Sequence, residues 1–468
     1  MKLRGWVKLL MTVLILLFAQ DAARSQTDNR PNILLIVSDD QGYGDAGFQG
    51  CVDIPTPHLD QLAKSGVVCS NGYVTHCFCS PTRAGLLTGR FQQRFGHEFN
   101  PVYDPLDQSE GLPLGERLLP QYLRETGYRT GWIGKWHLGS SPRHQPGARG
   151  FDETFGFIGG GHRFLGWAPS GRQYTLPIER DGKAVEVDGH LTTRFGKEAS
   201  SFVGKDKNKP WFLYLAFNAP HTPHEPTPEK LALFSRIQNP TRRKYAAQLS
   251  LMDDAIGDVM KTLETTGQRE RTLVFFFSDN GGPVRTNGSD NGKLKGQKGD
   301  LLEGGIRVPF VVSWPTKLPA GATYDHPVVS LDAFGTALAL AGAKPAVGVT
   351  MDGVDILPHL RGEKASPPHE HLYWRKGGGV ERALRLGEWK IITAKNQPAR
   401  LFNLKEDPGE TTDQAAVKPE VLAKLSKVLD AVDNQMIPPA FPGSSVKNED
   451  WGPGGANQAK PKINPAKP

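Results

Sequence analysis

The chain has 468 residues, 38% of them hydrophobic, and a formal net charge of +7. This length and apolar content allow one large packed domain, with or without a small one, and exclude the fibrous, collagen-like and disordered classes. Four cysteines are too few for a disulfide scaffold. The modest positive charge suits an anionic substrate. The sequence contains no arginine-rich stripe of the kind that binds nucleic acid, so we expect no nucleic-acid partner.

Residues 1–25 have the features of a signal peptide. Lys2, Arg4 and Lys8 precede an apolar run at 9–19, and a small-residue cleavage site follows at 23–25. The alternative is a membrane anchor, but the apolar run is short for a bilayer span. We therefore expect an exported protein, periplasmic or secreted, without a stable membrane anchor.

Short apolar runs that end abruptly in polar residues recur along the next part of the chain. They lie at 32–38, 129–134, 212–217, 273–278 and 308–314. Runs of this length fit strands that are covered on both faces, and helical patterns at 115–126 and 245–264 lie between them. The alternation predicts an α/β fold with a large, mostly parallel but mixed central sheet flanked by helices. We assign this catalytic domain to residues 26–362.

The composition changes near residue 363, in the sequence EKASPP. Four short strand patterns follow, at 372–374, 383–386, 389–393 and 400–404, and then an amphipathic helix at 419–435. They predict a smaller C-terminal α+β subdomain over 363–437, built on an antiparallel sheet. Proline, glycine, lysine and asparagine dominate from residue 438 to 468, which predicts a disordered tail.

Reactive side chains stand where the apolar runs end. Because ligands bind at the carboxyl ends of parallel strands, we expect these residues to converge on one cleft. They are Asp39 and Asp40, Lys135 and His137, His221, and Asp279 with Asn280.

The segment Cys79-Ser80-Pro81-Thr82-Arg83 is predicted to begin a helix, because proline suits the first turn. A group at a helix N-terminus feels the positive end of the helix dipole, which favours an anion beside it. Arg83, four residues on, falls on the same helix face as Cys79. A nucleophile, backbone amides and a guanidinium would then meet. Taken alone, the pattern fits a buried cysteine before a helix equally well.

The acidic strand ends suggest a metal site. Asp39, Asp40, Asp279 and Asn280 offer only oxygen ligands, which suit Ca²⁺ or Mg²⁺. The alternative is a solvated strand end or a helix cap, but two adjacent carboxylates repel each other without a cation.

The remaining candidates are lysines and histidines. Lys135 and His137 are two residues apart, so they point the same way on an extended strand end. His221 follows a strand and could transfer a proton, with His224 as a weaker rival. Lys298, in a glycine-rich loop, could neutralise a leaving oxygen. Solvated lysines and a packed histidine are the alternatives.

At these residues the sequence resembles the type I, formylglycine-dependent sulfatases, arylsulfatase-like members of the alkaline phosphatase superfamily. The signature C-x-P-[ST]-R is followed by Leu-Thr-Gly-Arg at 87–90, and Thr82 stands where many relatives have serine. Threonine keeps the hydroxyl, so we expect modification of the cysteine to survive. Other family landmarks occur in order at 31–42, 134–139, 219–221, 278–282, 296–299 and 303–305.

The resemblance implies that Cys79 is converted to formylglycine (3-oxoalanine) by a formylglycine-generating enzyme. It implies that Ca²⁺, with Mg²⁺ as the alternative ion, is held by the four oxygen-bearing residues and the modified Cys79. One hydroxyl of the aldehyde hydrate would attack sulfur while Arg83, Lys135 and Lys298 balance the charge. His221, helped by Lys298, would protonate the leaving alcohol. His137 would then take the proton of the second hydroxyl as sulfate is expelled.

Exported members of this family mostly act on sulfated glycans, so a sulfated carbohydrate is the expected substrate, with aryl sulfates cleaved in vitro. The loops at 100–107 and 159–167 could line its pocket, with His162 and Arg163 as candidate sugar contacts. Two alternatives stay open: a phosphomonoester or phosphonate hydrolase of the same superfamily, and a catalytically inert glycan-binding homologue.

Overall fold

The computed structural model describes residues 30–170 and 173–443. The predicted signal peptide and most of the predicted tail lie outside the described residues. Within the described part of the chain, no helix combines the length and the apolar character needed to cross a bilayer.

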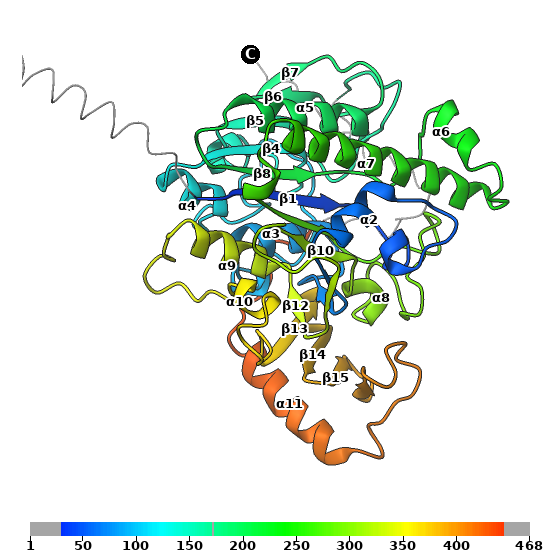
Figure 1. Cartoon of the computed structure of the whole chain (residues 1–468). Coiled ribbons are helices and arrows are strands. Elements are labelled where there is room, and N and C mark those ends of the chain that lie inside the picture. The colour runs from blue at the N-terminus through cyan, green and yellow to red at the C-terminus, as the bar shows by residue number, and fades with distance from the viewer. Residues whose placement is uncertain (1–29, 171–172, 444–468) are drawn as a thin grey trace, which may run out of the picture.

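The core of the molecule is one ten-stranded mixed sheet (Figure 1). Its central strands run parallel in the order β9 (Thr272–Ser278), β1 (Asn32–Ser38), β8 (Trp211–Ala216), β4 (Arg129–Lys135) and β5 (Glu153–Phe157). Shorter strands complete the edges: β10 (Phe310–Ser313), β2 (Val67–Cys69) and β11 (Ala322–Tyr324) beyond β9, and β6 (Ile178–Arg180) and β7 (Lys183–Val185) beyond β5. The predicted mixed, mostly parallel sheet is confirmed, and the run at 308–314 contains β10, which pairs antiparallel with β9.

Both faces of this sheet are covered, which explains why its strands are apolar throughout. Ile33, Leu35 and Val37 of β1 face one core cluster, whereas Leu34 and Ile36 face the other. The first cluster includes α3 (Cys79–Thr88), α4 (Leu119–Glu125), α9 (Leu331–Leu340) and α10 (Leu357–Leu360). The second includes α2 (Pro57–Lys64), α5 (Leu191–Lys205), α7 (Pro240–Thr265) and the shorter α6 (Pro228–Leu233).

The ends of two helices differ from those predicted, for local reasons. α7 begins five residues earlier than expected, at Pro240, because the Asn239 side chain accepts hydrogen bonds from the amides of Thr241 and Arg242. α4 begins later, at Leu119, where the Gln121 side chain accepts from the Leu118 amide at 2.8 Å. Capping contacts therefore determine the first residue of both helices.

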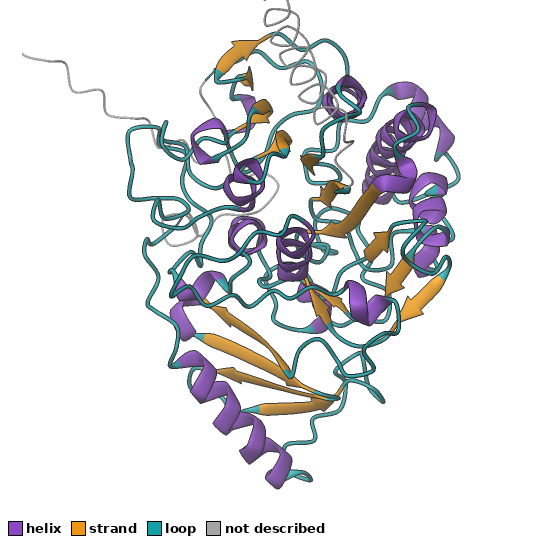
Figure 2. Cartoon of the chain, turned by 60° about the vertical axis from the view of Figure 1, so that its left-hand side comes forward, coloured by secondary structure: helices purple, strands orange, loops and turns teal. Residues whose placement is uncertain are grey.

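The C-terminal part forms the predicted antiparallel sheet (Figure 2). Its strands are β13 (His371–Lys376), β14 (Glu381–Leu386), β15 (Trp389–Ala394) and β16 (Arg400–Asn403). α11 (Pro419–Asp433) packs on it through Leu425, Leu429 and Val432. Residues 438–443, which we assigned to the tail, pack on the main domain, because the Ala440 amide donates to Gly96 O at 2.8 Å and Phe441 lies edge-on to His97.

Buried polar contacts join this subdomain to the main domain. Trp374 of β13 donates from Nε1 to Val74 O at 2.7 Å, next to the short pair β3 (Gly72–Tyr73) and β12 (Val328–Val329). Lys390 of β15 lies 2.9 Å from both Glu303, the first residue of α8 (Glu303–Ile306), and Glu410. Since all three side chains are fully buried or nearly so, this ion triad fixes the subdomain relative to α8.

Replacing Lys390 with Met should therefore destabilise the protein strongly, because two buried carboxylates would lose their cation. We expect the free energy of unfolding to fall by about 3–5 kcal/mol, measured by denaturant and thermal unfolding. The matched control is Lys395→Met at an exposed position of the same subdomain. Equal stability of the two variants would contradict this role.

Candidate active site

The predicted site residues converge at the carboxyl edge of the main sheet. The register that pairs Ser38 with Ser278 puts the residues that follow β1 and β9 side by side. Each residue lies at or just after the end of a strand: Asp39 and Asp40 after β1, Lys135 at the end of β4, His221 in the loop after β8, and Asp279 with Asn280 after β9.

Carboxylates and a thiol form a tight buried cluster here. The ligand atoms of Asp39, Asp40, Cys79 and Asp279 all lie within 4.8 Å of one another. Asn280 donates from Nδ2 to Asp40 Oδ1 at 2.7 Å, and its buried Oδ1 has no partner among the described residues. An unsatisfied carbonyl oxygen beside several carboxylates fits a hard divalent cation such as Ca²⁺.

Two lysines balance the negative charge of this cluster. Lys135 Nζ lies 2.6 Å from Asp39 Oδ2 and is fully buried, while Lys298 Nζ lies 2.7 Å from Asp40 Oδ1. Burial tends to raise the pKa of Asp40, but Lys298 and His221 outweigh it and lower that pKa to about 2. Asp40 is therefore ionised and able to bind a cation throughout the physiological pH range.

Arg83 holds the third carboxylate in place. Its Nε and Nη2 donate to Asp279 Oδ2 at 2.9 and 2.7 Å, and its Nη1 donates to Lys135 O at 3.2 Å. The Tyr214 hydroxyl lies 3.4 Å from Nη1. Sequence reasoning missed Tyr214, although it stands in the predicted strand at 212–217; its position becomes meaningful only when α3 lies across β8.

The start of α3 is held by its own hydroxyl groups. Ser80 Oγ donates to His137 O at 2.5 Å and lies 2.7 Å from His97 Nε2. Thr82 Oγ1 donates to His76 O at 3.0 Å, so the hydroxyl of the signature threonine is engaged in an internal hydrogen bond. Cys79, the first residue of the helix, is thereby fixed with Sγ 3.5 Å from Asp39 Oδ1.

Two site residues adopt an unusual backbone conformation. Asp40 has φ 65° and His137 has φ 62°, in the left-handed region that residues other than glycine seldom adopt. Such positions concentrate at functional sites. Gly160 makes room for His137, since a Cβ there would lie 2.5 Å from His137 Nε2.

The histidines differ in what they can reach. His221 Nε2 lies 3.5 Å from Asp40 Oδ2, whereas His224 turns away, with Nε2 3.0 Å from Pro220 O. Burial lowers the pKa of His221 to about 4, and burial beside Lys135 and Arg83 lowers the pKa of His137. Both rings are therefore neutral at pH 7, and a bound anion would raise the pKa of His221.

The two predicted sugar contacts, His162 and Arg163, differ in their surroundings. The ring nitrogens of His162 lie 2.6 and 2.8 Å from Arg163 O and Leu176 O, and the side chain is buried. His162 therefore holds its own loop together through both ring nitrogens, and its role as a sugar contact stays a prediction. Arg163 forms an ion pair with Glu225 at 2.7 Å. Its role as a sugar contact stays a prediction.

A small pocket opens beside His137, and parts of both predicted loops line it. Residues 101–103 and 158–160 contribute to its wall. Tyr174, which no sequence motif marked, also lies close to the centre. Burial raises its pKa to about 12, and the charges of Lys298, Asp39 and Asp40 act on it.

A parallel sheet whose carboxyl edge carries clustered carboxylates, a buried arginine and two lysines defines an α/β enzyme built for an anionic substrate. A family model described as Sulfatase matches residues 31–343. The chain belongs to the sulfatase family, in the alkaline phosphatase superfamily, and is a sulfatase, an enzyme that hydrolyses sulfate esters.

Known proteins agree with this assignment. N-acetylgalactosamine-6-sulfatase of Mus musculus is 29% identical, with 97% of this chain and 96% of that protein covered. Arylsulfatase J of Mus musculus is 30% identical, with 91% and 80% covered. The crystal structure of Ps i-CgsB in complex with k-i-k-neocarrahexaose superposes with a TM-score of 0.84 at 37% identity, over 88% of this chain and 94% of that one.

If the carboxylate cluster holds a divalent cation, calcium should stabilise the chelator-treated protein. At a calcium concentration 100 times Kd the gain is about 2.7 kcal/mol, seen as a higher melting temperature. Asp40→Asn should lose most of this response, whereas Asp53→Asn, at an exposed carboxylate, should keep it. An equal calcium response in wild type and Asp40→Asn would contradict the metal assignment.

Proposed function

We propose that the protein is an exported sulfatase that removes sulfate from a sulfated carbohydrate, using a formylglycine nucleophile made from Cys79 and a divalent cation, most simply Ca²⁺. The observation that carries this proposal is the place of Cys79. It is the first residue of α3, and its Sγ shares one 4.8 Å cluster with the ligand atoms of Asp39, Asp40 and Asp279. Both the cleavage chemistry and the export by residues 1–25 are part of the proposal.

The side chains around Cys79 supply the positive field that an anionic ester requires. When bound, the cation would polarise a sulfate oxygen and help to neutralise the charge of the ester. Arg83, Lys135 and Lys298 surround the same point, and their charges stabilise the negative charge that develops on oxygen during the reaction. Because most of these groups are buried, water screens them little.

Two histidines divide the proton transfers. His221, beside Asp40 and Lys298, is placed to donate a proton to the oxygen of the departing alcohol. His137 is tied to the start of α3 through its backbone oxygen and Ser80, and its Nδ1 has no partner among the described residues. We assign to it the proton that the residue-79 hydroxyl gives up when sulfate leaves.

A sulfated glycan is the substrate class that the relatives favour. The relative with 37% identity was solved with a neocarrahexaose, and the curated relative with 29% identity is named for sulfated N-acetylgalactosamine. Sulfated galactans are therefore the first saccharides to test, in a panel screened for released sulfate. Maturation of Cys79 would need a formylglycine-generating enzyme in the host.

Cys79→Ser should abolish multiple turnover, because a serine sulfate ester has no internal route to release sulfate. The measurement is sulfate release over many enzyme equivalents, together with mass spectrometry of the peptide that contains residue 79 in the native enzyme. Cys51→Ser, at a partly exposed cysteine outside the carboxylate cluster, is the control and should stay active. Normal turnover by Cys79→Ser would overturn the proposal.

His221→Ala should slow the cleavage of sulfate esters with poor leaving groups by about 10²–10⁴-fold. The effect should be much smaller for a nitrophenyl sulfate, whose phenolate leaves without protonation. His224→Ala is the matched control, since its ring faces Pro220 O and Tyr245. A loss in His221→Ala that is the same for every leaving group would show that this ring is not the proton donor.

A further inference from the structure

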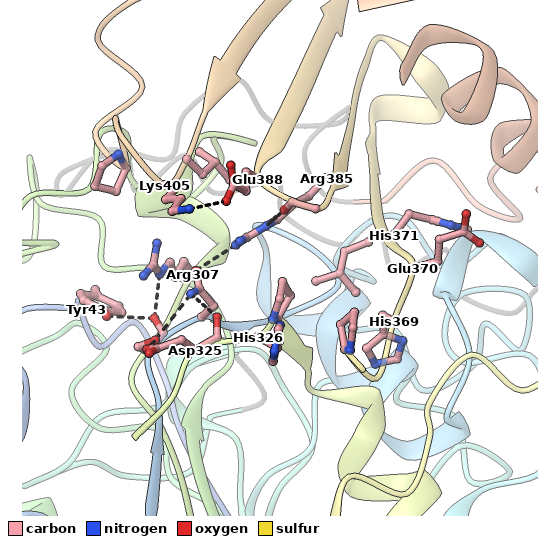
Figure 3. Close-up of a pocket in the computed structure, with 18 of the residues that line it drawn as sticks. Tyr43, Arg307, Asp325, His326, His369, Glu370, His371, Arg385, Glu388 and Lys405 are labelled. Atoms are coloured by element: carbon pink, nitrogen blue, oxygen red, sulfur yellow. Dashed lines mark hydrogen bonds and ion pairs between the residues drawn. The ribbon is translucent and has the colours of Figure 1, made fainter. Parts of the chain in front are cut away.

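A second, larger cleft lies between the main domain and the C-terminal subdomain (Figure 3). Its volume is about 800 Å³, and none of the catalytic residues lines it. Tyr43, Asn71 and Arg307 come from the main domain, and Arg385 and Leu404 come from the subdomain.

The cleft opens at the same edge of the sheet as the catalytic centre. β2 pairs antiparallel with β10, which pairs antiparallel with β9, so β2 runs in the same direction as β9. Ser70 and Asp325, which follow β2 and β11, lie in the cleft wall. The loop at 293–298 lies between the two places, because Lys293 lines the cleft and Lys298 contacts Asp40.

Two nearly buried arginines form the floor of the cleft. Arg307 and Arg385 are 6% and 7% exposed. Arg385 donates to Asn71 Oδ1 at 2.9 Å, to Gly387 O at 3.0 Å and to the Tyr73 hydroxyl, all uncharged acceptors. Among the described residues no carboxylate lies within ion-pair distance of Arg385, and both arginines make their hydrogen bonds through Nε and Nη1.

The ion network behind the arginines leaves positive charge unmatched. Arg307 Nη1 lies 3.4 Å from Glu303 Oε2, but the same carboxylate lies 2.9 Å from Lys390. Glu410 is the other acid of this network and also pairs with Lys390. The charges of Arg307, Arg385 and Lys390 thus face two carboxylates, although Arg385 makes no direct ion pair with either. Because an unpaired charge away from water is costly, an oxyanion in the cleft would be stabilised there.

The walls suit a sugar that carries the anion. The Tyr43 ring lies against Arg307, with the guanidinium carbon 5.4 Å from the ring centroid, and Leu404 adds apolar surface. Three acidic side chains line the cleft. Glu388 pairs with Lys405 at 2.9 Å, Asp325 accepts from Ser70 Oγ at 2.5 Å, and Glu370 is exposed to solvent beside His369 and His371. Exposed Lys293 supplies a further positive charge at the rim.

We propose that this cleft is a second binding site, separate from the catalytic centre, for a sulfate or carboxylate group carried on an anionic saccharide. Arg385 and Arg307 bind the oxyanion, and Tyr43 packs against the sugar ring. The identity of the saccharide as the enzyme's own polymeric substrate rests on the proposed function, but the anion site itself does not. Its consequence is tighter binding of long chains than of short ones.

The test compares saccharide binding with catalysis on a small ester. Lys293→Glu and Arg385→Gln should each weaken the binding of a sulfated carrageenan hexasaccharide by about tenfold or more in calorimetric titrations. Both should leave kcat/KM for an aryl sulfate unchanged. Lys424→Glu, the same charge reversal on the outer side of α11, is the control. Because Lys293 is exposed, its variant tests the site even if Arg385→Gln fails to fold.

Unchanged hexasaccharide binding in Lys293→Glu and in folded Arg385→Gln would overturn the second site. A parallel titration with inorganic sulfate distinguishes the two sources of the anion: affinity equal to that of the hexasaccharide, lost in the same variants, would overturn the saccharide assignment. If the wild type binds the hexasaccharide through these residues but cleaves no sulfate ester, the proposed function is overturned and the second binding site is still supported.

Discussion

The crowding of Asp39, Asp40 and Asp279 at one point is the constraint on which the rest of the site depends. Like charges this close raise one another's pKa unless cations lie among them. Arg83, held by α3, and Lys135, at the end of β4, meet this requirement in the protein itself. The positive groups that stabilise the carboxylates are therefore the same groups that attract an anionic ester.

Holding buried charges in contact requires a rigid frame, and the two-faced sheet supplies it. Each central strand buries alternate residues in one of two hydrophobic clusters, so a shift of register would expose apolar groups on both faces. With the register of β1 and β9 fixed, Asp39 and Asp279 must emerge side by side. The cost of gathering the carboxylates is thus offset by apolar burial far from the site.

Local features of the sequence predict part of this site, and contacts between distant segments make up the rest. Strand ends and the cysteine signature are local features, so the sequence predicts that Asp39, Lys135 and Cys79 meet at the carboxyl edge of the sheet. Tyr214 and Tyr174 approach the centre only because distant segments pack there, and no periodicity records such contacts. His162 shows what the sequence pattern does not record: a histidine in a glycine-rich loop suggested a ligand contact, and both of its ring nitrogens lie at backbone carbonyls of its own neighbourhood.

One segment of the chain connects the catalytic centre, the second cleft and the C-terminal subdomain. Lys293 lines the second cleft, Lys298 contacts Asp40, and Glu303 binds Lys390 of the subdomain. All three charges lie on the chain between β9 and β10, so the anchoring of Glu303 by the buried triad limits the movement of Lys298 at the catalytic centre. The C-terminal subdomain therefore contributes to the geometry of the catalytic centre as well as packing on the main domain. Its buried Lys390 positions a loop that carries positive charge to both anion-binding places.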